Sequence, residues 1–149
     1  GGRGLFRYYV KYQATAPQCS YHGGIGTGDD SGRERGHLGI SNDIQFGPMI
    51  MFGLGGIYVE VLKDVAFRIV PVSVEDADAM IREIRSFPLL RGVRGEPATD
   101  LLAIRRSILS LSQMALDFPE IIEADINPLL VRPEGKGAVA VDARFTIQE

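Results

Sequence analysis

Hydrophobic and polar positions follow clear periods from about residue 40 to the end of the chain. The run at 57–72, "IYVEVLKDVAFRIVPV", is rich in β-branched and aromatic residues, which favours one or two strands. Residues 121–131 and 138–147 also read as strands, and "RPEGKG" between them is typical of a turn. We therefore expect a sheet whose last two strands form a hairpin, preceded by a glycine-broken apolar run, "GPMIMFGLGG", at 47–56.

Two helices are predicted between these strands. Ser73 is the N-cap candidate of the first, and Asp76 follows three residues later, where an acid in the first turn is favoured. The second helix begins near Asp100 and must end before Pro119. The buried stripes expected are Val74, Ala77, Met80, Ile81 and Ile84 in the first helix, and Leu101, Ile104, Ile108, Leu111 and Ala115 in the second. Strands, two helices and strands in this order indicate an α+β fold, with 87–100 as a loop.

Composition narrows the class of protein. The chain has 149 residues, of which 45% are hydrophobic, and this suffices for one compact domain. A net charge of -3 gives no global basic field, so we expect neither nucleic acid nor a membrane as partner. The lone Cys19 excludes a disulfide framework and fits the cytoplasm. No apolar run reaches the roughly 20 residues of a membrane span, and the chain reads as a fragment.

The predicted hairpin gathers polar side chains. A two-residue turn at Glu134–Gly135 sets which positions face each other across the two strands. The opposed pairs are Asn127 with Asp142, Asp125 with Arg144, and Glu123 with Thr146. The opposite face is predicted to enter the core with Ala124, Ile126, Leu130, Val139, Val141 and Phe145.

Asp125, Asn127, Asp142 and Arg144 then form one polar cluster. Amide and carboxylate oxygens are ligands that suit Mg²⁺, which keeps waters or substrate phosphates for its other positions. A solvated face with an Asp125–Arg144 pair explains the same pattern. A bulge at Pro128 would change the register and separate the cluster.

A second candidate feature is the glycine run Gly53, Gly55 and Gly56, which follows an apolar strand as phosphate-cradling loops do. A P-loop is not indicated, because no Gly-Lys-Ser/Thr follows and the next residues look strand-like. A glycine-bent hairpin is the alternative. Arg68 lies on a predicted strand as a possible ligand contact, whereas His37 has no partner at metal-ligand spacing.

Residues 40–149 resemble the ATP-grasp domain of ADP-forming acyl-CoA synthetases, which are relatives of succinyl-CoA synthetase β chains. The stretches that carry the resemblance are "SNDIQFGPMIMFGLGGIYVEVLKDVAFRIVP", "FPLLRGVRGEPATD", "DFPEIIEADINPLLV" and "AVAVDAR". The resemblance implies the second, C-terminal ATP-grasp subdomain, with a mixed or antiparallel sheet and two helices. It implies an enzyme, an acetate/acyl-CoA ligase (ADP-forming), that moves a phosphoryl group between a phosphohistidine and ADP or ATP with Mg²⁺.

The resemblance also implies residue roles and partners. Asn127 and Asp142 would bind Mg²⁺, with Asp125 beside them as a further ligand or supporting acid. Gly53, Gly55 and Gly56 would lie near the nucleotide phosphates. The CoA-binding and ligase domains of the same enzyme would be the partners, in one chain or as separate subunits, and this chain alone is expected to be inactive.

Residues 1–39 depart from the family. They hold more than half of the 18 glycines and lack a hydrophobic period. Back-translation of 24–39, read one base later, allows the string Val-Leu-Val-Gln-Glu-Met that the family carries at this place. We therefore expect residues 1–39 to be out-of-frame translation or disordered, with 40–149 as the genuine subdomain.

Two other functions fit the sequence. The chain is alternatively the ligand-sensing, synthetase-like part of a fused protein acetyltransferase, which the full gene would reveal. A non-catalytic scaffold that docks through its acidic hairpin is the third interpretation, and it predicts no effect of Mg²⁺–nucleotide on stability.

Overall fold

The computed structural model describes residues 5–10 and 34–148. In this part of the chain, seven strands form one sheet in the order β1-β7-β5-β2-β3-β4, with β6 paired to β5, and every pairing is antiparallel. The strands are β1 (Leu5–Val10), β2 (Glu34–Asp43), β3 (Gly47–Leu54), β4 (Val65–Ile69), β5 (Ile121–Val131), β6 (Ala138–Ala140) and β7 (Ala143–Gln148). The helices are α1 (Ile57–Glu60), α2 (Val74–Glu83), α3 (Phe87–Leu90) and α4 (Leu101–Asp117). The α+β fold is confirmed.

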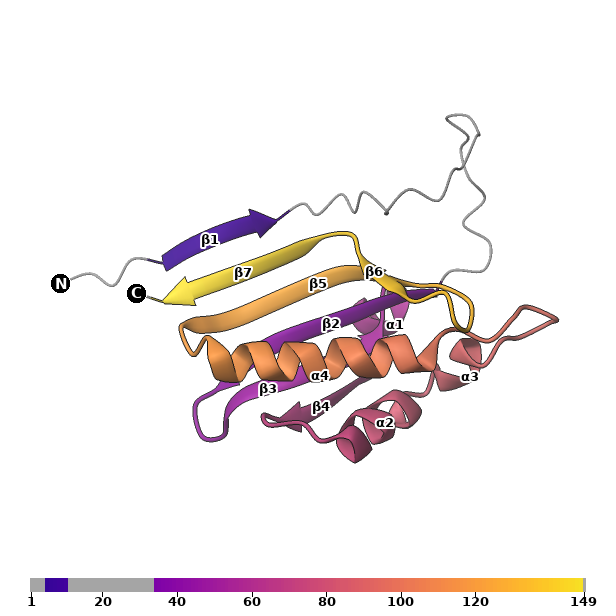
Figure 1. Ribbon diagram of the computed structural model, residues 1–149, viewed down its shortest axis with the longest axis horizontal. Helices are drawn as coiled ribbons and strands as arrows, with labels where there is room; N and C mark the ends of the chain where they lie inside the picture. Colours follow the sequence, from indigo (N-terminus) through magenta and orange to yellow (C-terminus); the bar gives the residue numbers. More distant parts are fainter. Residues whose placement is uncertain (1–4, 11–33, 149) are drawn as a thin grey trace.

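The sheet has two unlike faces (Figure 1). Helices α2 and α4 pack on one of them, which we call the inner face, and the short α1 lies on the other, the outer face. The side chains of Leu38, Ile40, Ile50 and Phe52 fill the core against α4. Since successive strand residues point to opposite faces, the neighbours of these residues line the outer face. That face is where a ligand has room to approach.

Both predicted helices are confirmed with their caps. Ser73 accepts a hydrogen bond from the Asp76 backbone N–H, and the Asp76 carboxylate accepts one from Ser73 N–H, which completes a capping box. Asp100 caps α4, which ends at Asp117, two residues before Pro119. Val74 was wrongly assigned to the buried stripe and is 45% exposed, because it occupies the first turn of α2 at the edge of the packed surface.

The run at 57–72 was only partly predicted. Strand β4 covers 65–69, but residues 57–60 form the single helical turn α1 instead of strand. Gly56, with φ of 68°, turns the chain out of the sheet and starts this turn. The loop at 87–100 likewise contains the short helix α3. Tertiary position has overridden β-propensity here.

The core face of the hairpin was predicted wrongly in its second half. Ala124 and Ile126 do face the core, but beyond Pro128 the buried residues are Leu129 and Val131 instead of Leu130. In the opposite strand of the hairpin, the residues that face the core change at the same level. Ala138 and Ala140 pack on the core, Val139 does not, and Val141 is exposed. The switch occurs where β6 ends and β7 begins, so regular alternation does not continue through this point.

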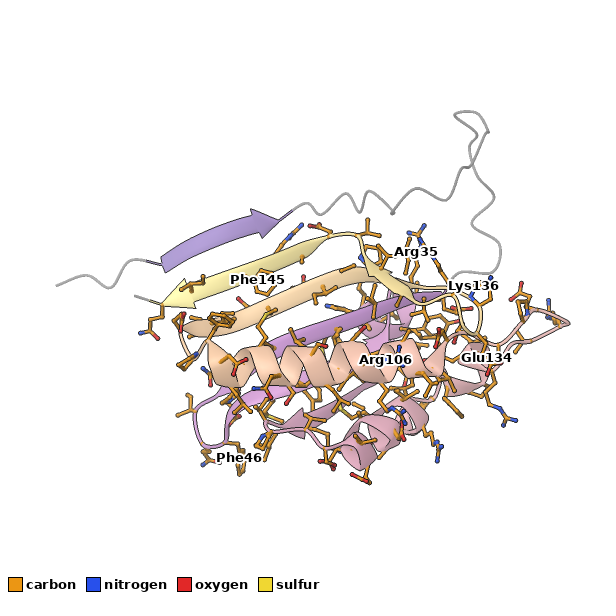
Figure 2. The ribbon with its side chains drawn as sticks, in the orientation of Figure 1. Arg35, Phe46, Arg106, Glu134, Lys136 and Phe145 are labelled. Carbon is orange, nitrogen blue, oxygen red and sulfur yellow. The ribbon has the colours of Figure 1, made fainter. Side chains whose placement is uncertain are left out.

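Strand β2 runs from Glu34 to Asp43 without a break and pairs with β3 and β5 along its length. It therefore crosses the boundary predicted between residues 39 and 40. Figure 2 shows Phe46 in the turn that follows, Glu134 and Lys136 in the β5–β6 turn on the other side of the view, and Arg106 on α4 between them. Among the described residues, no helix combines the length and the apolar character that crossing a membrane requires.

Candidate functional site

The predicted hairpin register is confirmed. Asp125 faces Arg144 and Glu123 faces Thr146 across β5 and β7, and the Thr146 hydroxyl donates to the Glu123 carboxylate at 3.1 Å. The backbone N–H of Asn127 donates to the carbonyl of Asp142 at 3.0 Å. The register continues unchanged past Pro128 to the pair of Leu129 and Ala140. In the pairing of β5 with β7 the irregularity lies between Ile121 and Glu123, so the polar cluster is not separated. A bulge does lie beside Pro128, but it is in the pairing of β5 with β2, where the register shifts between Gly36–Leu129 and Leu38–Ile126.

The polar cluster has a specific pattern of contacts. Oδ1 of Asp125 contacts Nε2 of His37, which lies on the neighbouring strand β2. Asp142, in the link between β6 and β7, lies 3.8 Å from the guanidinium of Arg144 on β7. The Asp125–Arg144 pair considered from the sequence is thus replaced by two other pairs. Asn127, whose residue is exposed, sits between them at the level of the glycine run.

Each of the three glycines in the run meets a different structural condition. A Cβ at Gly53 would lie 2.7 Å from the carbonyl oxygen of Asp64, so close packing requires glycine there. A Cβ at Gly55 would lie 3.5 Å from Oδ1 of Asn127 and 3.3 Å from the carbonyl oxygen of Arg35. Gly56 needs its positive φ and has open space around it. The run therefore approaches Asn127, which is the first direct link between the two predicted features.

Arg68 is placed apart from the other predicted residues. Its side chain lies on the inner side of β4, where it donates to Glu83 of α2 at 2.6 Å and to the carbonyl of Phe67 at 2.8 Å. The structure brings together Gly55, Asn127 and the acids of the hairpin, but not Arg68. Its contacts fix the end of α2 to the edge strand β4 and give no support to a ligand role.

The donor set at the hairpin fits a cation only in part. Among the described residues, no group of three or more His, Cys, Asp or Glu side chains is placed to hold a metal ion. Asn127 and Asp142 offer one amide and one carboxylate on adjoining strands. Two hard oxygen donors are what Mg²⁺ takes from a protein when phosphates and waters complete its shell. The residues present thus suit a metal that arrives with a phosphorylated ligand.

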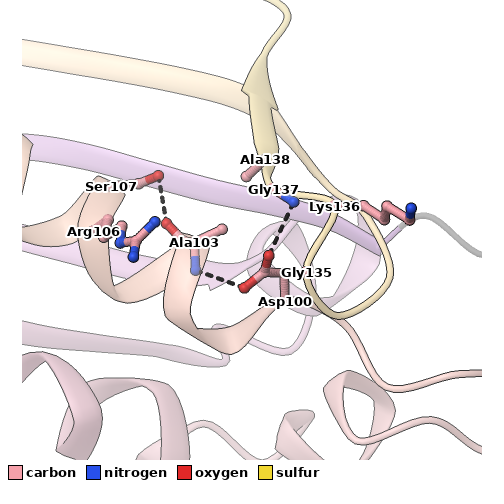
Figure 3. A pocket seen from close by; sticks show the side chains of 8 residues that line it. All are labelled: Asp100, Ala103, Arg106, Ser107, Gly135, Lys136, Gly137 and Ala138. Carbon is pink, nitrogen blue, oxygen red and sulfur yellow. Dashed lines mark hydrogen bonds between the residues drawn. The ribbon is translucent and has the colours of Figure 1, made fainter.

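A pocket between the start of α4 and the β5–β6 turn serves the structure of the domain (Figure 3). The carboxylate of Asp100 accepts hydrogen bonds from the backbone N–H of Ala103 at 3.0 Å and of Gly137 at 2.9 Å. Burial acts to raise the pKa of Asp100, but these bonds and one from Gly135 outweigh it and hold the pKa below its usual value. Asp100 therefore ties the start of α4 to the β5–β6 turn.

Asp64 plays a similar part near the glycine run. Its carboxylate accepts from the backbone N–H of Arg85 at 2.7 Å and of Ser86 at 2.8 Å. Burial acts to raise the pKa of Asp64, yet hydrogen bonds from Ser86 and Arg85 prevail and lower the pKa. The segment after α1, which packs on Gly53, is thereby anchored to the end of α2.

Sequence reasoning missed His37. It lies 88 residues from Asp125 in the chain, so no local spacing could have paired them. The sequence offered only an indirect indication of its role, the pairing of β2 with β3 that places His37 directly opposite Gly53. Only the pairing of β2 with both β3 and β5 puts this ring between the glycine run and the hairpin.

Comparisons with known proteins agree with this architecture. The family model "ATP-grasp domain" matches residues 30–147, so the chain belongs to the ATP-grasp family. The β subunit of acetate–CoA ligase [ADP-forming] I from Pyrococcus furiosus is 49% identical over 110 residues, which are 74% of this chain and 47% of that subunit. The 4-hydroxybutyrate–CoA ligase [ADP-forming] from Nitrosopumilus maritimus is 52% identical over 108 residues, 72% of this chain and 16% of that protein. The chain thus spans less than half the length of either relative.

A solved structure gives the same result. A dinucleotide-forming acetyl-coenzyme A synthetase 1 from Ca. Korarchaeum cryptofilum is 39% identical, with a TM-score of 0.73 over 76% of this chain and 53% of that one. That protein was solved with coenzyme A and Mg-AMPPCP, its phosphohistidine segment pointing towards the nucleotide binding site. The ATP-grasp family and the second-subdomain fold expected from the sequence are confirmed.

Proposed function

We propose that this chain is the second ATP-grasp subdomain of an ADP-forming acid–CoA ligase. In that enzyme it holds the Mg²⁺-bound phosphates of ADP or ATP while a phosphoryl group passes to or from a phosphohistidine. The partners are the CoA-binding and ligase domains of the same enzyme, as one chain or as separate subunits. The identities of 49% and 52% to two ADP-forming CoA ligases support this proposal.

The meeting of Gly55 with Asn127 is the observation that carries the proposal. The glycine run and the hairpin were singled out for separate reasons, and they adjoin on the face that α2 and α4 leave open. A flat backbone surface next to an amide and a carboxylate suits a phosphate chain with its metal. A Cβ at Gly55 would be tight against the carbonyl oxygen of Arg35 and in ordinary contact with Oδ1 of Asn127, so glycine leaves the space beside this amide free for a ligand.

The chain's own residues have defined tasks in this reaction. Phosphoryl transfer depends mainly on in-line placement and on charge neutralisation, and bound Mg²⁺ supplies the latter. Asn127 and Asp142 would hold the metal from adjoining strands. Gly55 lets the backbone approach the phosphates closely, and Gly56 directs the chain away into α1. The substrate acid is set by domains that this chain does not contain.

A chimeric enzyme tests the proposal. Residues 34–148 replace the matching segment of the Pyrococcus furiosus β subunit, and the chimera is assembled with its partner subunit. ATP formation from ADP, phosphate and acetyl-CoA is then followed. We expect a turnover within about tenfold of the parent, and a loss of about 100-fold or more in Asn127→Ala and Asp142→Asn.

Glu120→Gln is the matched control, because Glu120 lies in the turn before β5. Its backbone carbonyl accepts a hydrogen bond from Gln148 N–H, and its side chain has no hydrogen bond within the described part of the chain. A folded chimera without activity, or full activity in the Asn127 and Asp142 variants, would show that this segment does not perform the proposed task.

A further inference from the structure

His37 and Asp125 make one contact that joins the two halves of the outer face. The side chain of His37 is 17% exposed and that of Asp125 42% exposed, so the contact is partly shielded from water. An ionised carboxylate can only accept hydrogen bonds. Nε2 of His37 must therefore carry the proton that it shares with Asp125, which leaves Nδ1 as the other ring nitrogen.

The position of the contact matters as much as its chemistry. His37 stands directly opposite Gly53, the first glycine of the run, while Asp125 stands opposite Arg144 in the hairpin. The glycine run and the hairpin otherwise meet through the approach of Gly55 to Asn127. The bond between His37 and Asp125 thus fixes how these two parts of the site lie relative to each other.

We propose that His37 and Asp125 form a positioning pair, in which His37 holds Asp125 away from the metal and fixes the hairpin against the glycine run. This inference rests on the proposed function and on His37 being the residue that the gene encodes. It assigns Asp125 the supporting role rather than that of a further ligand, because His37 engages one of its two carboxylate oxygens, Oδ1, and turns the group toward β2. The metal ligands contributed by this chain are then Asn127 and Asp142 alone.

The contact itself is tested on the 149-residue chain by nitrogen NMR of its histidine rings. The chain has two histidines, so His22→Gln leaves the His37 signals alone. Measured at a pH where the ring is neutral, His37 is expected almost wholly as the Nε2–H tautomer, and Asp125→Ala is expected to shift its Nε2 resonance and to let the Nδ1–H tautomer appear. The Nδ1–H tautomer, or a ring unaffected by Asp125→Ala, would overturn the proposal.

The role of Asp125 is tested in the chimeric enzyme by metal rescue. A cysteine ligand binds the soft ion Cd²⁺ better than Mg²⁺, so a true ligand position changes its metal preference when it becomes cysteine. We expect Asp142→Cys to lose activity with Mg²⁺ and to regain about tenfold or more with Cd²⁺. Asp125→Cys should lose activity with both ions, as should His37→Ala.

The double variant gives an independent readout. If His37 and Asp125 act only through each other, His37→Ala with Asp125→Ala should lower turnover no more than either single change. Rescue of Asp125→Cys by Cd²⁺, additive losses in the double variant, or failure of Asp142→Cys to respond to Cd²⁺ would each contradict the assignment. An inactive parent chimera would instead refute the proposed function, and the NMR measurement would still decide the His37–Asp125 contact.

Discussion

Replacement of Asp100 by alanine should destabilise the domain although Asp100 lies far from the candidate site. Its side chain is 8% exposed, and its two oxygens serve two different elements, Ala103 in α4 and Gly137 in the β5–β6 turn. Loss of the helix cap costs about 1 kcal/mol. Loss of the acceptor for the Gly137 N–H adds about 1–3 kcal/mol. We therefore expect the free energy of unfolding to fall by about 2–4 kcal/mol.

Urea unfolding followed by circular dichroism measures this change directly, with the slope checked for constancy. For a domain of this size the loss corresponds to a melting temperature lower by about 8–15 °C. Asp117→Ala is the matched control, since Asp117 lies at the exposed end of the same helix and pairs with Gln113; its effect should stay within about 0.5 kcal/mol. A loss below about 1 kcal/mol in Asp100→Ala would refute the idea that Asp100 joins α4 to the turn.

Three further predictions follow from the same contacts. The pKa values of Asp64 and Asp100 in the folded state lie below the ordinary 3.8, so these carboxylates stabilise the fold above that pH and lose their contribution as pH falls through the folded pKa. The free energy of unfolding should therefore fall more steeply with pH below about pH 4. Asp100→Asn should make this dependence on pH weaker. Gly53→Ala should lower the free energy of unfolding in urea by about 1–3 kcal/mol more than Gly36→Ala does. A Cβ at Gly53 would lie 2.7 Å from the Asp64 carbonyl oxygen, whereas the nearest atom to a Cβ at Gly36 is 3.4 Å away. Equal losses in the two variants would contradict the packing argument. The isolated chain should show no micromolar ATP binding by calorimetry, because the proposed site offers only Asn127 and Asp142 as metal donors; tight binding would refute this.

Local chemistry made the helices and the hairpin predictable. Ser73 and Asp100 are N-cap residues that indicate where α2 and α4 begin. The turn at Glu134–Gly135 sets the pairing of Asp125 with Arg144. The face switch after Pro128 was not predictable from alternation, because it accompanies a shift of register between β5 and β2, two strands that are distant in the chain. The helical turn α1 was missed because Ile57 and Val59 favour strands unless the fold turns them out of the sheet.

The candidate site was predictable only where its parts are close in sequence. Asn127 and Asp142 were found through the hairpin, and the glycines through their spacing. His37 required knowledge that β2 pairs with β5, a contact between distant parts of the chain. The position of Arg68 was not predictable, because a strand residue has two possible faces and the packing of α2 decides which one it uses; its role in ligand binding stays a prediction.

The change of reading frame before residue 40 stays a prediction about the gene. The family match begins at residue 30 and β2 at residue 34, so the described fold itself has no boundary at 39. Sequencing of the DNA across codons 1–41 would show whether a single-base shift restores the string Val-Leu-Val-Gln-Glu-Met. The same reads would show whether His37 is the residue that the gene encodes, whereas confirmation of the written frame would refute the shift.

Calorimetric binding of the ATP analogue AMPPCP to the chimeric enzyme, with and without Mg²⁺, tests the central claim most directly. If Asn127 and Asp142 hold the metal on the nucleotide phosphates, Mg²⁺ should tighten binding by about tenfold or more in the chimera. The Asn127→Ala, Asp142→Asn double variant should then bind the nucleotide with and without Mg²⁺ about equally. An undiminished effect of Mg²⁺ in the double variant would show that the metal is held elsewhere and would contradict the account.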